Sequence, residues 1–145
     1  MSVSIRAATT ADRTRCFELL DQLSAATGTS HSDAGIATFD ELTTGQRGTV
    51  LVAEEDGRLL GMASVSFNLA IRYGGEYCQL EELIVDPAAR GKNVGGLLVQ
   101  GTVDMARSRG CREYGLYLIE STEHNRPFYE KYGFRAVGTE MRQTF

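Results

Sequence analysis

The residues with the clearest chemical potential form a basic, glycine-rich turn at positions 86–96. The turn is Asp-Pro-Ala-Ala-Arg-Gly-Lys-Asn-Val-Gly-Gly, and a helical apolar stripe follows it directly. A helix start exposes backbone N–H groups without partners and the positive end of the helix dipole. Glycines let a ligand come close to that backbone, and Arg90 and Lys92 add positive charge. Three glycines and two cations at a helix start therefore predict a phosphate-type anion site rather than a plain tight turn.

Two common phosphate motifs do not fit this turn. A P-loop needs Gly-x-x-x-x-Gly-Lys-Ser/Thr, whereas Gly91-Lys92 is followed here by Asn93 and the earlier glycine position is Asp86. A dinucleotide fingerprint places Gly-x-Gly-x-x-Gly after a first strand. The glycines here stand at positions 91, 95 and 96, behind several predicted strands. Both ligand classes are therefore disfavoured.

The elements that must position this turn follow from the apolar pattern. Alternating residues predict strands over residues 3–7, 49–54, 59–68, 79–85, 114–119, 134–137 and 141–145. Helical stripes predict one helix after a Thr9–Asp12 capping box, a second ending before Gly45, a third from Val94 to Gly110, and a short one over residues 124–132. The order β-α-α-β-β-β-α-β-α-β-β predicts an α/β sheet, antiparallel early and crossing over later, in a single domain over residues 1–145.

Composition excludes several classes of function. The 145 residues include 19 acidic and 15 basic side chains, for a net charge of -4, which argues against a nucleic-acid binder. The sequence shows no signal peptide and no apolar run long enough to cross a membrane, so we expect a cytoplasmic protein. Three scattered cysteines and two distant histidines lack the spacing of a metal site, so we expect no metal.

Two segments resemble the GNAT superfamily of N-acetyltransferases. Residues 80–98 resemble its acetyl-CoA signature, Arg/Gln-x-x-Gly-x-Gly/Ala after a strand that ends in an apolar-Val-x-Pro step. Residues 127–134, Pro-Phe-Tyr-Glu-Lys-Tyr-Gly-Phe, resemble the superfamily's Phe-Tyr-x-x-x-Gly-Phe segment. The two motifs come in the family's order, and the element order fits essentially the whole chain. The resemblance implies a mixed, mostly antiparallel central sheet flanked by helices, with a splayed strand pair that holds the cofactor.

The resemblance also implies how acetyl-CoA is bound. We expect its pyrophosphate on the amides of the turn and its pantetheine arm along residues 83–85, where the strands at 80–85 and 114–119 splay apart. A backbone N–H near Ile84 or Val85 would polarise the thioester carbonyl. Asn93 replaces a usual glycine, and asparagine tolerates left-handed backbone. The expected cofactor-binding residues are Leu83, Ile84, Val85, Arg90, Gly91, Lys92, Asn93, Val94, Gly95, Gly96 and Asn125.

An amine acceptor brings two proton transfers. An alkylammonium group with a pKa of ~10.4 is only about 0.04% free base at pH 7, so a general base helps. Related proteins place a carboxylate near Glu81, which we expect to be the base, with Glu82 as the second candidate. Successive strand residues point to opposite faces, so without a bulge only one of them faces the amine, and positions 79, 81, 83 and 85 share one face. Tyr129 matches the family's general acid for the CoA thiolate.

The acceptor itself is not identified by any distinctive motif. The resemblance assigns specificity to residues 24–45 and 70–77, where His31, Asp33, Arg72 and Tyr73 are candidates. Small-molecule amines are the expected substrates. The alternatives are a protein or peptide N-acetyltransferase and an acyl-CoA-binding regulatory domain without turnover. The family often pairs through its C-terminal strands, so a homodimer is a further expectation.

Overall fold

The computed structural model describes residues 2–27 and 33–145, and its centre is one five-stranded sheet with strand order β1-β2-β3-β4-β5. The strands are β1 (Ser4–Ala7), β2 (Gly48–Glu55), β3 (Arg58–Ala70), β4 (Gly75–Val85) and β5 (Tyr114–Gly115). The first four pair antiparallel, whereas β4 and β5 pair parallel, with helix α3 (Val94–Arg109) in the crossover between them. The mixed, mostly antiparallel α/β sheet predicted from the sequence is confirmed.

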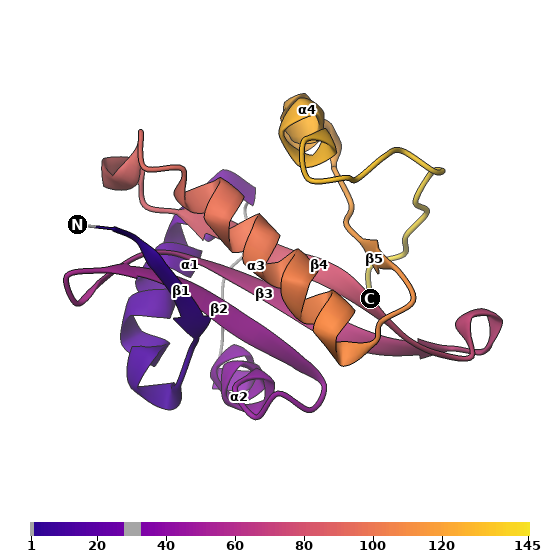
Figure 1. Cartoon of the computed structure of the whole chain (residues 1–145), viewed down its shortest axis with the longest axis horizontal. Helices are drawn as coiled ribbons and strands as arrows, with labels where there is room; N and C mark the ends of the chain where they lie inside the picture. Colours follow the sequence, from indigo (N-terminus) through magenta and orange to yellow (C-terminus); the bar gives the residue numbers. More distant parts are fainter. Residues whose placement is uncertain (1, 28–32) are drawn as a thin grey trace.

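Helices cover both faces of this sheet (Figure 1). Helices α1 (Arg13–Thr27) and α2 (Asp33–Leu42) lie on one face, and α3 lies across the other. Because successive side chains of β2 and β3 point to opposite faces of the sheet, they contribute to two separate hydrophobic cores. One core joins residues of α1 and α2 to every second strand residue: Cys16, Leu19, Phe39, Val50, Val52 and Met62. The other joins α3 to the residues in between: Leu51, Ala63, Val65, Val94 and Leu98.

Several local signals in the sequence form as predicted. The Thr9–Asp12 capping box is present and opens a 3-10 turn before α1. Asp56 and Gly57 both have positive φ, at 53° and 77°, as a two-residue hairpin turn requires. Gly110 has a φ of 87° and ends α3. Each of these features depends on interactions within a few residues, which is why the sequence pattern located them.

The C-terminal third differs from the prediction. The strand expected over 114–119 pairs only at Tyr114 and Gly115. The short helix expected over 124–132 begins and ends earlier, as a 3-10 helix (Glu120–Asn125) followed by α4 (Arg126–Glu130). In the described chain, residues 134–137 and 141–145 form no strand. A strand needs a neighbouring strand for its backbone groups, but β5 ends at Gly115, and residues 134–145 pair with no strand of the described chain. The predicted closing strands are therefore wrong for the isolated chain.

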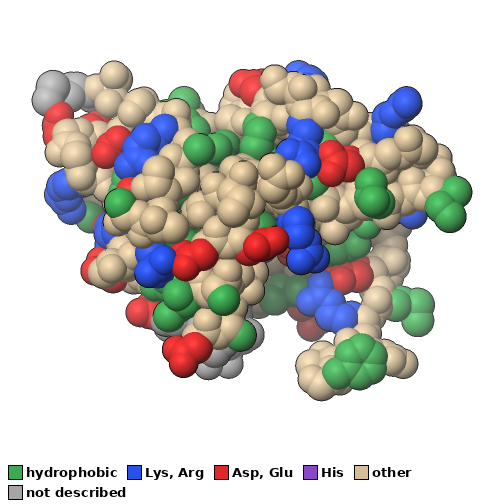
Figure 2. All heavy atoms as spheres, turned by 90° about the horizontal axis from the view of Figure 1, so that it is seen from below, with side chains coloured by type: hydrophobic (Ala, Val, Ile, Leu, Met, Phe, Trp, Pro, Cys, Tyr) green, Lys and Arg blue, Asp and Glu red, His purple; other side chains and the backbone are tan. Residues whose placement is uncertain are grey.

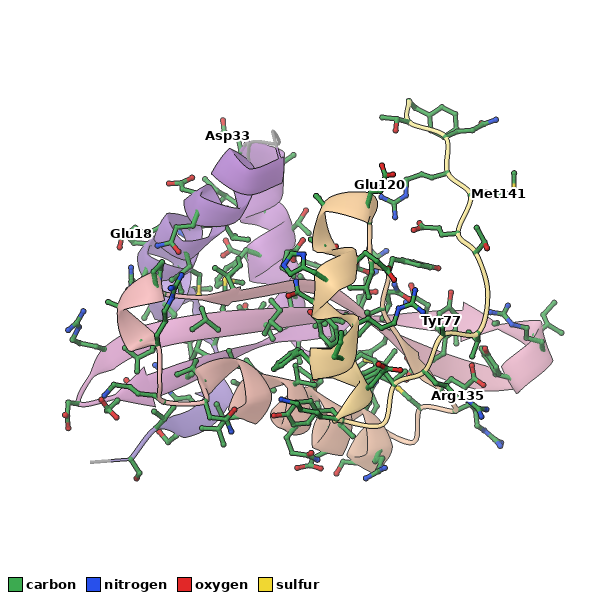
Figure 3. All side chains as sticks on the ribbon, turned by 90° about the horizontal axis from the view of Figure 1, so that it is seen from above. Glu18, Asp33, Tyr77, Glu120, Arg135 and Met141 are labelled. Carbon is green, nitrogen blue, oxygen red and sulfur yellow. The ribbon has the colours of Figure 1, made fainter. Side chains whose placement is uncertain are left out.

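Residues 134–145 instead form an extended segment, here called the C-terminal arm. Its large apolar side chains are almost fully exposed, at 88% for Val137, 93% for Met141 and 109% for Phe145. Figure 2 shows the arm standing apart from the body, and Figure 3 shows Met141 far from the helices and the sheet. In the described residues, no helix is long and apolar enough to span a membrane.

Candidate active site

The glycine-rich turn leads into the start of α3, as the sequence predicted. Gly91 has a φ of 85°, and Asn93 adopts the left-handed conformation with a φ of 56° directly before Val94. The Asn93 side chain makes no capping hydrogen bond to the helix. Within the described structure, the first amides of α3 are therefore left without a side-chain acceptor, which is the arrangement that binds an anion.

The two cations of the turn are placed differently. The ammonium group of Lys92 lies 2.7 Å from Glu55 Oε1 at the end of β2. This contact lowers the pKa of the Glu55 carboxyl. Arg90 is exposed to solvent beside the turn. Before it could bind an anion on the turn, Lys92 would have to exchange its contact with Glu55.

Gly95 and Gly96 have different surroundings. A Cβ atom at Gly95 would lie 3.5 Å from Phe128 Cζ and 3.6 Å from Val85 Cγ2, which are ordinary contacts. A Cβ atom at Gly96 would overlap the hydroxyl of Tyr132 and the side-chain oxygen of Asn93. Gly96 is therefore needed for close packing of Tyr132. Gly95 instead lies between Val85 of β4 and Phe128 of α4, at a distance that a single Cβ atom would fill.

Strand β4 has a free edge next to this turn. Its pairing with β5 is limited to Cys78 with Tyr114 and Gln79 with Gly115. The amide of Asp86 donates to the Leu60 oxygen of β3 at 2.8 Å. Because N–H groups alternate along a strand, those of Leu83 and Val85 point to the free edge. Of the two predicted donors to a thioester carbonyl, Val85 has the suitable direction and Ile84 faces β3.

A bulge in β4 brings Glu81 and Glu82 to the same face of the sheet. Ser64 pairs with Glu82 and Val65 pairs with Leu80, so Glu81 is an extra residue in β4. Glu82 accepts a hydrogen bond from Ser64 Oγ, and Glu81 Oε2 accepts one from Ser66 Oγ at 2.6 Å. The two serines are two residues apart on β3, and strand alternation points both toward α1 and α2.

The bulge also corrects the predicted alternation. Positions 79, 81, 83 and 85 were expected on one face, but the extra residue reverses the direction of the side chains that follow it. Leu83 and Val85 pack with the α3 core, and Ile84 packs with the α1–α2 core. The sequence showed both carboxylates but not the bulge, because a bulge is a property of the pairing between two strands.

The two carboxylates differ in their surroundings. Glu82 is half-buried and Glu81 is exposed. Burial raises the pKa of the Glu82 carboxyl, the hydrogen bond from Ser64 lowers it, and the nearby charge of Glu81 raises it further. A base with a raised pKa takes up a proton more readily near neutral pH. The geometry thus supports Glu82 as a base at least as well as Glu81.

Tyr129 lies in an aromatic cluster between α4 and the sheet. Its ring is 5.1 Å from that of Phe128 and 6.1 Å from that of Phe134, both edge-on. Burial raises the pKa of its phenol, so the group stays protonated in the physiological range. It packs against the α3 core, whereas Glu81 and Glu82 face α1 and α2. The predicted acid and bases therefore approach β4 from opposite faces of the sheet.

The other predicted site residues do not form one cluster in the described structure. Asn125 lies directly before α4. Arg72 stacks over the Tyr73 and Tyr77 rings at the β3–β4 hairpin, at 4.5 and 5.5 Å. Asp33 begins α2, and His31 lies outside the described residues. Ser64, Ser66 and Phe128 contact predicted site residues but were not identified from the sequence, since serine and phenylalanine are ordinary strand and core residues.

A separate cavity of about 660 Å³ lies between α3, residues 111–118 and the C-terminal arm. Tyr129, Tyr132 and Phe134 line it, but the glycine-rich turn and the Glu81–Glu82 bulge do not. The cavity lies beside β5, and its lining includes residues 134–137, which were expected to form a closing strand. Among the described residues, no group of three or more His, Cys, Asp or Glu side chains could hold a metal ion.

Comparisons with known proteins agree with the two motifs. The model of the Acetyltransferase (GNAT) family matches residues 14–134. Glucosamine 6-phosphate N-acetyltransferase 1 of Oryza sativa subsp. japonica is 37% identical over 142 residues, which cover 94% of this chain and 84% of that protein. Glucosamine 6-phosphate N-acetyltransferase of Trypanosoma brucei brucei is 35% identical over 94 residues, 64% of this chain and 62% of that protein. The crystal structure of glucosamine-6-phosphate N-acetyltransferase from Arabidopsis thaliana has a TM-score of 0.81 at 27% identity and covers 100% of this chain and 99% of its own.

Proposed function

Because the chain belongs to the GNAT family of acetyltransferases, we propose that it transfers the acetyl group of acetyl-CoA to the amine of a phosphorylated amino sugar. The observation that carries this proposal is the likeness, over 94% of the chain, to a glucosamine 6-phosphate N-acetyltransferase. The family and this relative are N-acetyltransferases, which supports the reaction class. The phosphorylated amino sugar is the more specific part of the proposal.

The start of α3 and the free edge of β4 fit acetyl-CoA. The amides at the start of α3, with Arg90 beside them, would hold the pyrophosphate. The pantetheine arm would lie along Leu83 and Val85, beside Gly95, where a larger side chain would reach toward Phe128. The N–H of Val85 would then donate to the thioester oxygen and stabilise the negative charge that develops there.

The proton transfers would be divided between the two faces of the sheet. A carboxylate of the Glu81–Glu82 pair takes one proton from the substrate ammonium group, and the free amine attacks the thioester carbon. The tetrahedral intermediate then expels the CoA thiolate, which takes the phenol proton of Tyr129. The phenolate recovers a proton from the acylated nitrogen, and the carboxyl returns its proton to solvent. The net products are the N-acetyl compound, the CoA thiol and one proton.

The direct test is release of CoA thiol from acetyl-CoA with single acceptors. The panel contains glucosamine 6-phosphate, glucosamine, an aminoalkylphosphonate, a polyamine, an aminoglycoside, an amino acid and a short peptide. We expect acceptor-dependent release with glucosamine 6-phosphate, and at least about tenfold lower kcat/KM with glucosamine, which lacks the phosphate. Release with a peptide but with no amino sugar would replace this proposal by a peptide N-acetyltransferase. Acetyl-CoA binding without turnover of any acceptor would favour a regulatory domain.

We further propose that two copies of the chain pair through the C-terminal arm. The arm exposes Val137, Met141 and Phe145, and the neighbouring residues Tyr117 and Ile119 are 56% and 46% exposed. Large exposed apolar groups mark interaction surfaces, and an unpaired strand edge accepts a strand from another chain. A second copy would supply both an apolar surface and a pairing strand, because its own arm could pair with residues 116–119. This pairing would also form the closing strands that the single chain lacks.

Light scattering after gel filtration tests the pairing. We expect about twice the chain mass of 15.9 kDa for the wild type. The triple substitution of Val137, Met141 and Phe145 by glutamate should give the single-chain mass, because it places charges in the apolar contact. The matched control replaces the exposed Leu69 and Ile71 of the β3–β4 hairpin by glutamate and should leave the dimer intact. A wild-type mass of one chain at all concentrations would refute the pairing.

A further inference from the structure

Strand β3 carries polar side chains on the face toward α1 and α2, where apolar residues would be expected. Met62 belongs to the core of that face, and strand alternation directs Ser64, Ser66 and Asn68 to the same side. Ser64 is only 2% exposed. Burying a hydroxyl is unfavourable unless it is hydrogen-bonded. The burial of Ser64 therefore indicates that its hydroxyl makes a hydrogen bond that offsets the cost of burial.

Each of the two serines holds one carboxylate of the bulge. Ser64 Oγ donates to Glu82 Oε1, and Ser66 Oγ lies 2.6 Å from Glu81 Oε2. The Asn68 amide donates to Ser66 Oγ at 3.0 Å, so the hydroxyl proton of Ser66 is left to point at Glu81. Without the extra residue in β4, strand alternation would bring only one carboxylate to this face. The bulge and the serines together form two separate, directed hydrogen bonds.

We propose that Ser64 and Ser66 are positioning residues that give the two carboxylates different tasks in the proposed N-acetyltransferase reaction. Ser64 holds Glu82 as the proton acceptor, and Ser66 holds Glu81 as the group that binds the substrate ammonium. In the proton transfer an N–H bond of the ammonium breaks and an O–H bond forms on Glu82. The nitrogen keeps the electron pair, and the charges of ammonium and carboxylate are both neutralised. The inference rests on the proposed function for its role in turnover, but its hydrogen bonds can be tested without turnover.

The surroundings of the pair favour this division. Burial raises the pKa of Glu82, as does the charge of Glu81, while the Ser64 hydroxyl stabilises the ionised form and lowers it. The described charged side chains of α1 and α2 are Arg13, Arg15, Glu18, Asp21, Asp33, Asp40 and Glu41. Of the two cations, Arg13 binds Asp40 and Arg15 binds Asp86 and Glu18. Neither of these arginines pairs with Glu82, which leaves Ser64 as its described hydrogen-bond donor.

The decisive measurement is the titration of Glu82 by NMR, in protein labelled with ¹³C at the glutamate carboxyl groups and without substrate. Ser64→Ala removes the donor to the ionised carboxylate, so the pKa of Glu82 should rise by about one pH unit. Ser64→Thr keeps a hydroxyl at the same position and should leave the titration close to that of the wild type. Thermal melting of each variant confirms that it is folded. An unchanged Glu82 titration in folded Ser64→Ala would overturn the proposal.

Turnover supplies the second readout. In Ser64→Ala the acidic limb of the kcat/KM profile should move to higher pH by the same interval as the Glu82 titration. Ser66→Ala should instead raise KM for the amine about tenfold and leave the acidic limb in place, because Glu81 is expected to bind rather than to accept the proton. Equal losses in both serine variants without a pH shift would mean that the serines are only structural. If the wild type acetylates no amine, the proposed function fails while the NMR titration still decides the role of Ser64.

Discussion

Replacing Tyr129 by phenylalanine should lower kcat by about 10²-fold or more, with little change in the binding of acetyl-CoA. The phenol is the group expected to return a proton to the CoA thiolate, and phenylalanine keeps the ring but has no proton to give. The hydroxyl of Tyr129 has no hydrogen-bond partner within the described structure, so its loss should not disturb the packing against Phe128 and Phe134. Because burial raises the pKa of the phenol, the wild type should keep this acid throughout the physiological pH range.

Tyr132→Phe is the matched control for this variant. Tyr132 belongs to the same motif and its ring lies 5.4 Å from Phe128, but its hydroxyl lies against Gly96. We expect its kcat to stay within a few-fold of the wild type. The measurement is steady-state CoA release at saturating acetyl-CoA, with acetyl-CoA affinity from calorimetry and stability from thermal melting. Equal rates for Tyr129→Phe and the wild type would remove Tyr129 from the mechanism and favour a different proton donor.

Replacing Gly95 by leucine should weaken acetyl-CoA binding by at least about 100-fold, or about 2.7 kcal/mol. The direction of a side chain at this position is set by the start of α3. Its Cβ atom lies 3.5 Å from Phe128 and 3.6 Å from Val85, so a leucine side chain extends into the space between β4 and α4. That space is where the pantetheine arm is proposed to run. Gly95→Ala adds only a Cβ atom at ordinary contact distance and should have a smaller effect.

Calorimetry with acetyl-CoA measures this effect, and Gly75→Leu is its control. Gly75 begins β4, has no positive φ, and has no atom within 4 Å of a Cβ built on it. A leucine there should leave both fold and affinity unchanged. If folded Gly95→Leu binds acetyl-CoA as tightly as the wild type, the cofactor lies elsewhere. The arrangement proposed around Val85 would then also be wrong.

The family and the glycine-rich turn could be predicted from the sequence because they depend on local patterns. The turn around Gly91, the start of α3 and the Asp56-Gly57 hairpin each involve a few consecutive residues whose backbone preferences are strong. The antiparallel meander of β2 to β4 also followed from strand periodicity and short connections. These features depend mainly on nearby residues and little on the rest of the chain.

Contacts between residues far apart in the chain could not be predicted from the sequence. The Lys92–Glu55 ion pair and the contact of Tyr132 with Gly96 join segments 37 and 36 positions apart, and no local pattern signals either. The closing strands were predicted from apolar alternation, which shows only that a segment is able to form a strand with one apolar face. Whether it forms a strand depends on an available edge, and β5 pairs only at Tyr114 and Gly115.

What the sequence determined by itself is the class of reaction, through two motifs in order, and the presence of adjacent carboxylates at Glu81 and Glu82. Only the tertiary structure decided how these carboxylates lie. The register of β3 against β4 leaves Glu81 as an extra residue, and this single displacement turns both carboxylates to the face that Ser64 and Ser66 share. The physical reason is that strand register is set by pairing and packing across the sheet, so the direction of a side chain depends on residues far away in the chain.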